Sequence, residues 1–142
     1  MRAKPGPTYD TMEEQLHAKP RILVVDDDLG LRRFLTEALR RRYNVDTLPT
    51  GIQLAEVLNG NLPDLIILDV MLPWLNGFEL CKTIKTNPQW KHIPVLFLTG
   101  KRSNEDFAMG LKMGADGYLT KPFSMKELSE NVQELLSGAG TV

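Results

Sequence analysis

The amino-acid sequence predicts an α/β protein with a five-stranded parallel sheet and helices on both faces. Short, mostly apolar runs recur along the chain, and continuous runs of this length are typical of strands buried on both sides. Segments with apolar residues at helical spacing alternate strictly with these runs. Because the connections between them are short, the alternation favours parallel strands joined by crossover helices.

The third predicted strand, at residues 65–68, is the one around which the sheet is organised. Its sequence is Leu-Ile-Ile-Leu, it lies between Pro63 and Pro73, and it ends on the carboxylate of Asp69. A strand buried on both faces has no structural need for a charge, and ligands of parallel sheets bind beyond the carboxyl ends of the strands. The alternative is that Asp69 merely caps the following loop or helix.

Two strand–helix units precede this strand. The apolar run at residues 22–25 ends on three aspartates, and a helical pattern with a basic end at residues 40–42 follows it. Residues 45–48 predict the second strand. Residues 51–58 predict the second helix, which ends at the helix-stopping pair Asn59-Gly60.

The strand at residues 65–68 is followed by its own helix and then by two further strand–helix units. Apolar residues between positions 78 and 84 predict the third helix. Residues 94–98 predict the fourth strand, and Ser103 is placed to cap the fourth helix, which ends at Gly114. Residues 117–120 predict the fifth strand, and Ser124 with Glu127 predicts a capping box at the start of the last helix.

Length and composition are those of one ordinary globular domain. The chain has 142 residues, of which 42% are hydrophobic and 25% charged, enough for one core. Its net charge of −1 gives no long-range field for nucleic acid or membranes, and no apolar run approaches the ~20 residues that span a bilayer. With one cysteine, Cys81, and no apolar signal core, the cytoplasm is the default location.

Reactive side chains stand at the carboxyl ends of four of the five predicted strands. Clustered carboxylates repel one another unless a cation compensates, and Mg²⁺ is a hard ion that takes a couple of carboxylates and keeps several waters. A lysine and a hydroxyl beside Mg²⁺ would cradle a phosphoryl group. The alternative is that these residues are unrelated helix caps and surface charges. This would require residues of suitable chemistry to occur by chance at the same end of several strands. We therefore predict phosphoryl chemistry at a carboxylate nucleophile, carried by Asp26, Asp27, Asp69, Thr99 and Lys121.

These residues lie in stretches that resemble the receiver domain of bacterial two-component response regulators. The stretches are residues 24–27, 68–73, 98–100 and 114–123. The resemblance implies the flavodoxin-like strand order 2-1-3-4-5. Residues 1–20 contain prolines and charges without a period, which predicts a flexible N-terminal tail with room for a helical turn around residues 12–17. The chain thus divides into this tail, a receiver domain at residues 21–138 and a C-terminal tail at residues 139–142.

The resemblance implies a role for each metal-binding residue. Asp69 is expected to accept a phosphoryl group from a histidine kinase or phosphotransfer protein, with Mg²⁺ as the cofactor. Asp27 would bind the ion directly and Asp26 through a bound water. Asp69 and the backbone carbonyl of Met71 would complete the protein's ligands. Asp28 is expected to cap the first helix.

The remaining site residues act on the phosphoryl group or respond to it. By the same resemblance, Thr99 and Lys121 would bind the phosphoryl oxygens, and Tyr118 would follow the movement of Thr99 by changing rotamer. The peptide bond before Pro122 is expected to be cis, an isomer that only X-Pro makes cheap. We also expect the side chains of Met71 and Lys101 to flank the approach of water and to tune the phosphoryl lifetime, since they stand two residues past Asp69 and Thr99.

Two other functions fit the sequence less well. An aspartate-nucleophile phosphatase of the dehalogenase type needs a second acid two residues after the nucleophile, where this chain has Met71. A flavodoxin-type module needs a hydroxyl-rich phosphate loop after the first strand, where three aspartates would repel a phosphate. We therefore expect no enzyme activity beyond self-phosphorylation and self-dephosphorylation.

Output is expected to run through the face made by the fourth helix, the fifth strand and the fifth helix. In the DNA-binding transcription regulators of the resembling family, ion pairs on this face hold a symmetric dimer, and this chain has Gly117 and Asn131 at two of the charged positions. We expect a monomer or weak dimer that binds a different protein, with no direct contact to nucleic acid or membrane. The sequence leaves open the kinase, the pathway and whether the receiver stands alone or was cut from a longer chain.

Overall fold

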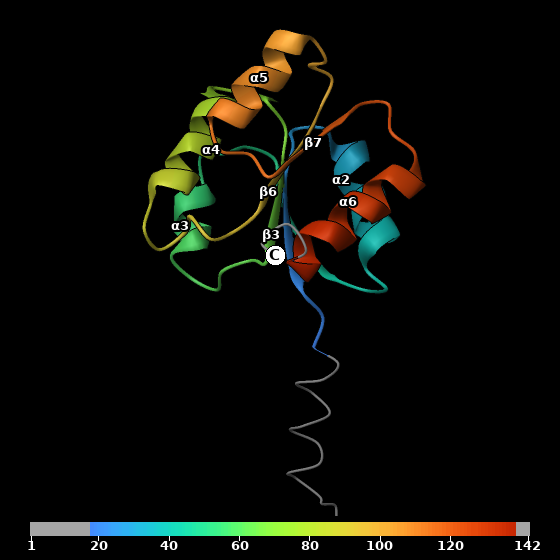
Figure 1. The fold of residues 1–142 in the computed structure, drawn as a ribbon. Helices are drawn as coiled ribbons and strands as arrows, with labels where there is room; N and C mark the ends of the chain where they lie inside the picture. Colours follow the sequence, from blue (N-terminus) through green and yellow to red (C-terminus); the bar gives the residue numbers. More distant parts are fainter. Residues whose placement is uncertain (1–17, 139–142) are drawn as a thin grey trace, which may run out of the picture.

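A computed structural model describes residues 18–138 and shows a five-stranded parallel sheet between two layers of helices (Figure 1). The strand order is β2-β1-β3-β6-β7, which confirms the predicted order 2-1-3-4-5. The strands are β1 (Arg21–Val25), β2 (Asn44–Leu48), β3 (Leu65–Leu68), β6 (Val95–Thr99) and β7 (Gly117–Thr120).

Each face of the sheet is covered by its own set of helices and has its own core. On one face α2 (Leu29–Leu39) and α6 (Met125–Ser137) pack over the sheet, and on the other lie α3 (Leu54–Leu58), α4 (Gly77–Thr86) and α5 (Asn104–Lys112) (Figure 1). All four residues of β3 are buried because they contribute alternately to the two cores. The continuous apolar runs of the central strands therefore follow from burial on both sides.

The helix starts use the caps that the sequence predicts. Asp28 caps α2, its carboxylate accepting a hydrogen bond of 3.2 Å from the Leu31 backbone N–H. Ser103 caps α5 with a full capping box, and Ser124 forms the expected box with Glu127 at the start of α6. These caps satisfy backbone N–H groups that have no partner inside the helix.

Two local features differ from the sequence-based expectation. Helix α3 begins at Leu54 and not at residue 51, because residues 51–53 form a turn in which the Leu54 N–H donates to the Gly51 carbonyl at 3.1 Å. A small antiparallel hairpin, β4 (Met71–Leu72) with β5 (Leu75–Asn76), follows the central strand and was not predicted. Strands of two residues are too short to show a period-2 pattern.

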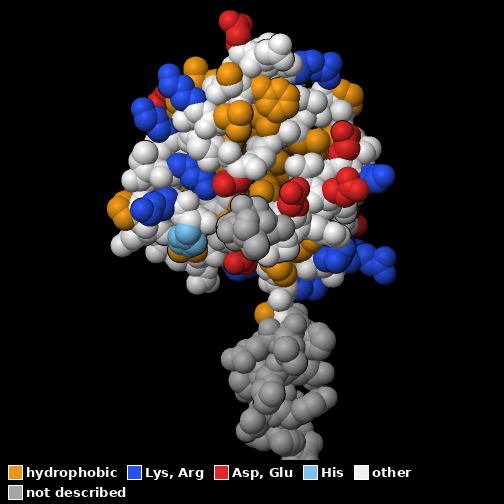
Figure 2. Space-filling view, viewed as in Figure 1, with side chains coloured by type: hydrophobic (Ala, Val, Ile, Leu, Met, Phe, Trp, Pro, Cys, Tyr) orange, Lys and Arg blue, Asp and Glu red, His pale blue; other side chains and the backbone are white. Residues whose placement is uncertain are grey.

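The described residues test some of the sequence-based expectations about the chain and leave others untested. Between residues 18 and 138, no helix combines the length and the apolar character needed to cross a bilayer. The helical turn expected around residues 12–17 and the tail at residues 139–142 lie outside the described residues, as does most of the tail at residues 1–20. On the face shown in Figure 2, basic and acidic side chains are interspersed.

Candidate functional site

Three carboxylates meet where β1 and β3 end. Asp26 and Asp69 extend the sheet ladder by one residue each: the Asp26 N–H donates to the Leu48 carbonyl and the Asp69 N–H to the Val25 carbonyl, both at 3.1 Å. Carboxylate oxygens of Asp26, Asp27 and Asp69 all lie within 4.8 Å of one another. Asp26 and Asp69 are only 2% and 6% exposed, whereas Asp27 faces solvent.

Lys121, which follows β7, joins two of these acids. Its Nζ lies 3.0 Å from Asp26 Oδ2 and 3.0 Å from Asp69 Oδ2. Burial favours the neutral amine, but the hydrogen bonds and charges of the two carboxylates outweigh it, so the pKa of Lys121 lies above its ordinary value. The ammonium therefore partly compensates the negative charge of the cluster.

The other oxygens of the two buried carboxylates accept backbone hydrogen bonds. Asp26 Oδ1 accepts from the Asp28 N–H at 2.9 Å, and Asp69 Oδ1 accepts from the Met71 N–H at 3.1 Å. The pKa of Asp26 is nonetheless raised, because burial of its charge outweighs these bonds and the Lys121 amine. Crowded hard oxygen donors of this kind suit a hard divalent cation, so Asp26, Asp27 and Asp69 fit a Mg²⁺ site.

Thr99 and Tyr118 meet at the backbone of Lys101. The buried Thr99 Oγ1 accepts a hydrogen bond of 3.2 Å from the Lys101 N–H, and the Tyr118 hydroxyl donates to the Lys101 carbonyl at 2.7 Å. The Tyr118 ring lies 5.7 Å from the Phe97 ring and 4.6 Å from the Phe107 ring. Burial, helped by the charges of Asp106 and Asp69, raises the pKa of Tyr118 to about 12.

Two arginines bind backbone carbonyls of site residues, and no sequence pattern predicts these contacts. The Arg102 guanidinium donates to the Lys121 carbonyl at 2.5 Å, and the Arg32 guanidinium donates to the Asp26 carbonyl at 2.8 Å. The Arg102 contact ties the loop after β6 to the lysine of the site. The peptide bond between Lys121 and Pro122 is cis.

Gly77 is a further site residue that the sequence analysis missed. Its N–H donates to the Val70 carbonyl at 2.8 Å, and a Cβ at this position would collide with the Asp69 carbonyl oxygen and lie 2.6 Å from the Val70 Cα. A glycine is therefore needed for the start of α4 to pass so close to the phosphoacceptor candidate. The neighbouring Asn76, which caps α4, is a residue type common in turns, but its presence does not reveal this contact.

A hollow of about 610 Å³ opens beside the acids, between the β4–β5 hairpin and the loop after β6. Asp27, Met71, Trp74 and Lys101 are among the residues that line it. The structure therefore brings Met71 and Lys101, the two residues expected to flank the phosphoryl group, to one hollow. The position of the Met71 carbonyl toward an ion stays a prediction.

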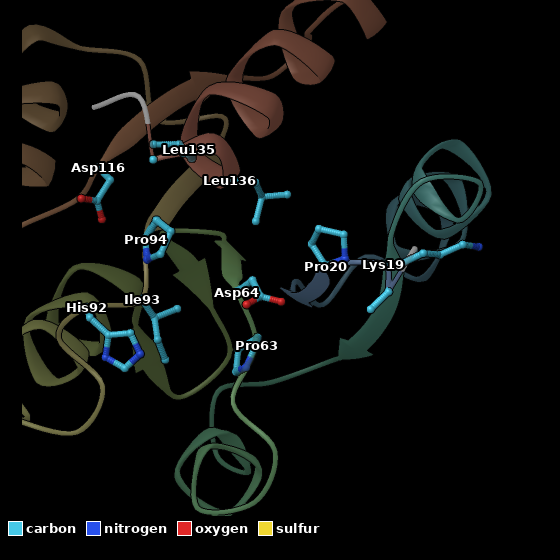
Figure 3. Close-up of a pocket in the computed structure, with 12 residues that line it drawn as sticks. Lys19, Pro20, Pro63, Asp64, His92, Ile93, Pro94, Asp116, Leu135 and Leu136 are labelled. Carbon is cyan, nitrogen blue, oxygen red and sulfur yellow. The ribbon is translucent and has the colours of Figure 1, made fainter. Parts of the chain in front are cut away.

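A second hollow lies at the opposite edge of the sheet (Figure 3). It measures about 670 Å³, and among its lining residues Pro20, Asp64 and Pro94 directly precede β1, β3 and β6. It is thus at the amino ends of the strands, at the edge opposite Asp26, Asp27 and Asp69. Parallel sheets place their chemistry at the other edge, so size alone does not identify the site.

Comparison with known proteins connects this geometry to one family. The family model described as "Response regulator receiver domain" matches residues 22–133. The response regulator MprA of Mycobacterium sp. (strain KMS) is 38% identical over 82% of this chain and 50% of its own. The phosphate regulon transcriptional regulatory protein PhoB of Rhizobium meliloti is 38% identical over 84% of this chain and 53% of its own. The chain thus spans about half the length of these relatives.

Solved structures agree with the sequence relatives. The chemotaxis protein CheY4 of Vibrio cholerae superimposes with a TM-score of 0.78 at 33% sequence identity, over 83% of this chain and 99% of that one. This match covers nearly the whole of a protein with the same fold.

Proposed function

The chain belongs to the family of response regulator receiver domains, and from this premise we propose that Asp69 accepts a phosphoryl group from a histidine kinase or phosphotransfer protein. The observation that carries the assignment is the Lys121 amine, which holds one oxygen of Asp69 and one of Asp26 at 3.0 Å. This places a cation where the charge of a phosphoryl group on Asp69 would build up. Asp69 is also itself buried and follows a strand that is buried at every residue, which favours it as the nucleophile over the exposed Asp27.

The chain's own residues would position the reaction. Asp69 Oδ1 accepts a hydrogen bond from the Met71 N–H, so we infer that Oδ2, which accepts one from Lys121, would be the oxygen that attacks phosphorus. The Lys121 amine would move with the transferred oxygens and offset their charge. Thr99 would exchange its contact with the Lys101 N–H for a phosphoryl oxygen. Asp26, Asp27, Asp69 and the Met71 carbonyl would hold a Mg²⁺ ion. When bound, this ion would neutralise part of the charge of the phosphoryl group.

The same geometry disfavours the two other functions. Met71, two residues after Asp69, offers a thioether in place of the acid that a dehalogenase-type phosphatase requires. The loop after β1 carries carboxylates that would repel the phosphate of a flavin. The relatives are signalling regulators, and we propose that this chain's only chemistry is its own phosphorylation and dephosphorylation.

The output surface is proposed to be the face made by α5, β7 and α6. Hydrophobic side chains gather over α5 in Figure 2. The helix itself carries the exposed Phe107 and Leu111. Phosphorylation on Asp69 would reach this face through Thr99, Lys101 and Tyr118, whose hydrogen bonds already connect it to the site. We propose that a downstream protein binds here in the cytoplasm, and that this domain itself does not contact nucleic acid or membrane.

Phosphoryl uptake from labelled acetyl phosphate tests the assignment of the nucleophile. Wild-type protein with Mg²⁺ should acquire label, and Asp69→Asn should not, because the amide is isosteric but cannot form the acyl phosphate. Flavin absorbance should not appear with the purified protein. Stable label on Asp69→Asn would refute the assignment.

The metal proposal has its own test in thermal unfolding. Millimolar Mg²⁺ should raise the melting temperature, because the three carboxylates form a site only in the folded chain. Asp27→Ala should remove this response, and a chelator should abolish phosphoryl uptake by the wild type. An Asp27→Ala variant that responds fully to Mg²⁺ would exclude Asp27 as a ligand.

A further inference from the structure

Trp74 stands at the tip of the β4–β5 hairpin in a conformation that tryptophan rarely adopts. Its φ is +63°, in the left-handed region, which costs a residue with a Cβ about 1–2 kcal/mol. Leu72 pairs with Leu75, so Pro73 and Trp74 are the two central residues of the turn. The turn combines proline at the first central position with a positive φ at the second, where glycine is the usual residue.

The fold gains little from the indole at this position. The Trp74 side chain is 83% exposed, whereas tryptophan in folded proteins is highly buried on average. The ring thus offers the core no packing, and the backbone would prefer another residue. A side chain that contributes so little to stability is a candidate for binding.

The surroundings of the ring point to what it could bind. Trp74 and Asp27 line the same hollow, and an Asp27 carboxylate oxygen lies within 4.8 Å of one of Asp69. Met71, which is 60% exposed, adds apolar surface, and Lys101 adds a positive charge. The hollow therefore combines an aromatic and a thioether face with a cation, next to the acid that receives the phosphoryl group.

We infer that the Trp74 indole receives the imidazole leaving group of the phosphodonor and makes this receiver selective for phosphohistidine over small phosphodonors. The inference rests on the proposed function of Asp69. In the step concerned, an Asp69 carboxylate oxygen forms a bond to phosphorus while the phosphorus–nitrogen bond of the donor breaks. The electron pair stays on the imidazole nitrogen, which takes a proton from solvent.

The geometry of the reaction brings the leaving group to the open side of the site. In an in-line displacement the leaving nitrogen lies opposite the attacking oxygen, and because Asp69 is buried, the donor must approach from the side where the acids meet solvent, beside which the hollow opens. An imidazole is flat and aromatic, and rings of this kind stack on indole faces. Acetyl phosphate and phosphoramidate carry no ring, so they gain nothing from the same surface.

The test compares three small donors on the full chain: phosphoimidazole, phosphoramidate and acetyl phosphate. The variant is Trp74→Gly, since glycine accepts the positive φ and keeps the turn while removing the ring. Initial rates of phosphorylation are followed by intact-protein mass spectrometry at subsaturating donor with Mg²⁺. We expect the rate with phosphoimidazole to fall about threefold to tenfold, and the rates with the other two donors to stay unchanged.

Two further variants separate the ring from general effects. Trp74→Phe should keep most of the preference for phosphoimidazole because it restores an aromatic face. Ile52→Ala, which removes another exposed hydrophobic side chain (61% exposed, in the turn before α3), should leave all three rates unchanged.

Each outcome decides between the inference and the proposed function. Equal rates for phosphoimidazole in the wild type and Trp74→Gly, or an equal fall with all three donors, would overturn the inference and leave the role of Asp69 intact. Absence of uptake from every donor by the wild type would instead refute the proposed function.

Discussion

Lys121, Asp26 and Asp69 show how single residues of this site could be predicted from sequence. The carboxyl ends of parallel strands meet at one edge, so acids after β1 and β3 and a lysine after β7 had to lie close together. The structure brings them within hydrogen-bond distance. Arg102 escaped prediction because its partner lies nineteen positions away in the chain, and only the folded loops bring them together.

At the residue scale, the titration of Tyr118 provides a test that needs no phosphodonor. Its pKa is raised from 10 to about 12 by burial first and by nearby carboxylates second. A raised pKa means that the folded state holds the proton more tightly. The stability that the protonated phenol contributes is therefore fully present below pH 10 and lost as the pH rises toward 12.

Absorbance titration of tyrosinate, as the difference between wild type and Tyr118→Phe, would measure this pKa. The free energy of unfolding of the wild type should fall more steeply than that of Tyr118→Phe over the same pH range. A difference titration centred at the ordinary tyrosine value would contradict the packing of the ring and hydroxyl described above.

Met71 and Lys101 carry a second prediction at the residue scale. Both line the hollow beside the acids, and the thioether of Met71 cannot orient a water molecule for attack on phosphorus. Met71→Asn should therefore speed loss of the phosphoryl group, since an amide can hold that water, and Lys101→Glu should also change the rate. Mg²⁺ affinity should stay the same in both. Unchanged lifetimes of the phosphorylated variants would show that neither residue tunes the loss of the phosphoryl group.

At the scale of elements, the strands and helices followed from periodicity but the hairpin did not. Apolar runs and caps predict the five strands and five helices because each is long enough to show its pattern. The β4–β5 hairpin depends on two residue pairs and on an unusual φ at Trp74. The hairpin lines the hollow beside the site, a position that the local sequence does not reveal.

The approach of α4 to β3 gives a prediction at this scale. Gly77→Ala should destabilise the protein by about 1–3 kcal/mol, because the added methyl group meets backbone atoms that side-chain rotation cannot move. It should also slow phosphoryl uptake, since the Asp69 carbonyl is among those atoms. Urea unfolding and acetyl phosphate uptake measure the two effects.

Gly60→Ala is the matched control for this substitution. A Cβ at Gly60 would meet the Val57 carbonyl oxygen at 3.5 Å, an ordinary contact, so stability and uptake should change little. Wild-type stability of Gly77→Ala would show that α4 has room to move away from the strand.

At the scale of the whole molecule, the proposed output face lacks two of the charges that we expect a symmetric dimer to use. Gly117 has no side chain, and the Asn131 amide already donates to the Glu127 carbonyl at 2.8 Å. Exposed ion pairs contribute only about 0–1 kcal/mol each, but two-fold symmetry doubles each loss. We therefore expect activation to create a surface for a different protein and no more than a weak dimer.

Sedimentation with and without beryllofluoride, a mimic of the phosphoryl group, would test this expectation. The protein should sediment as a monomer or weak dimer in both states. A tight dimer that forms on activation, and that charge reversal at Lys112 or Lys126 breaks, would show that the α5-β7-α6 face serves self-association instead.

The central claim is that Asp69 itself forms the acyl phosphate, and chemical mapping tests it most directly. Borohydride reduces an aspartyl phosphate to homoserine, which peptide mass spectrometry can locate in the sequence. After treatment with acetyl phosphate and Mg²⁺, we predict homoserine at position 69 and unmodified aspartate at positions 26 and 27. Homoserine at Asp26 or Asp27 with none at Asp69 would contradict the account.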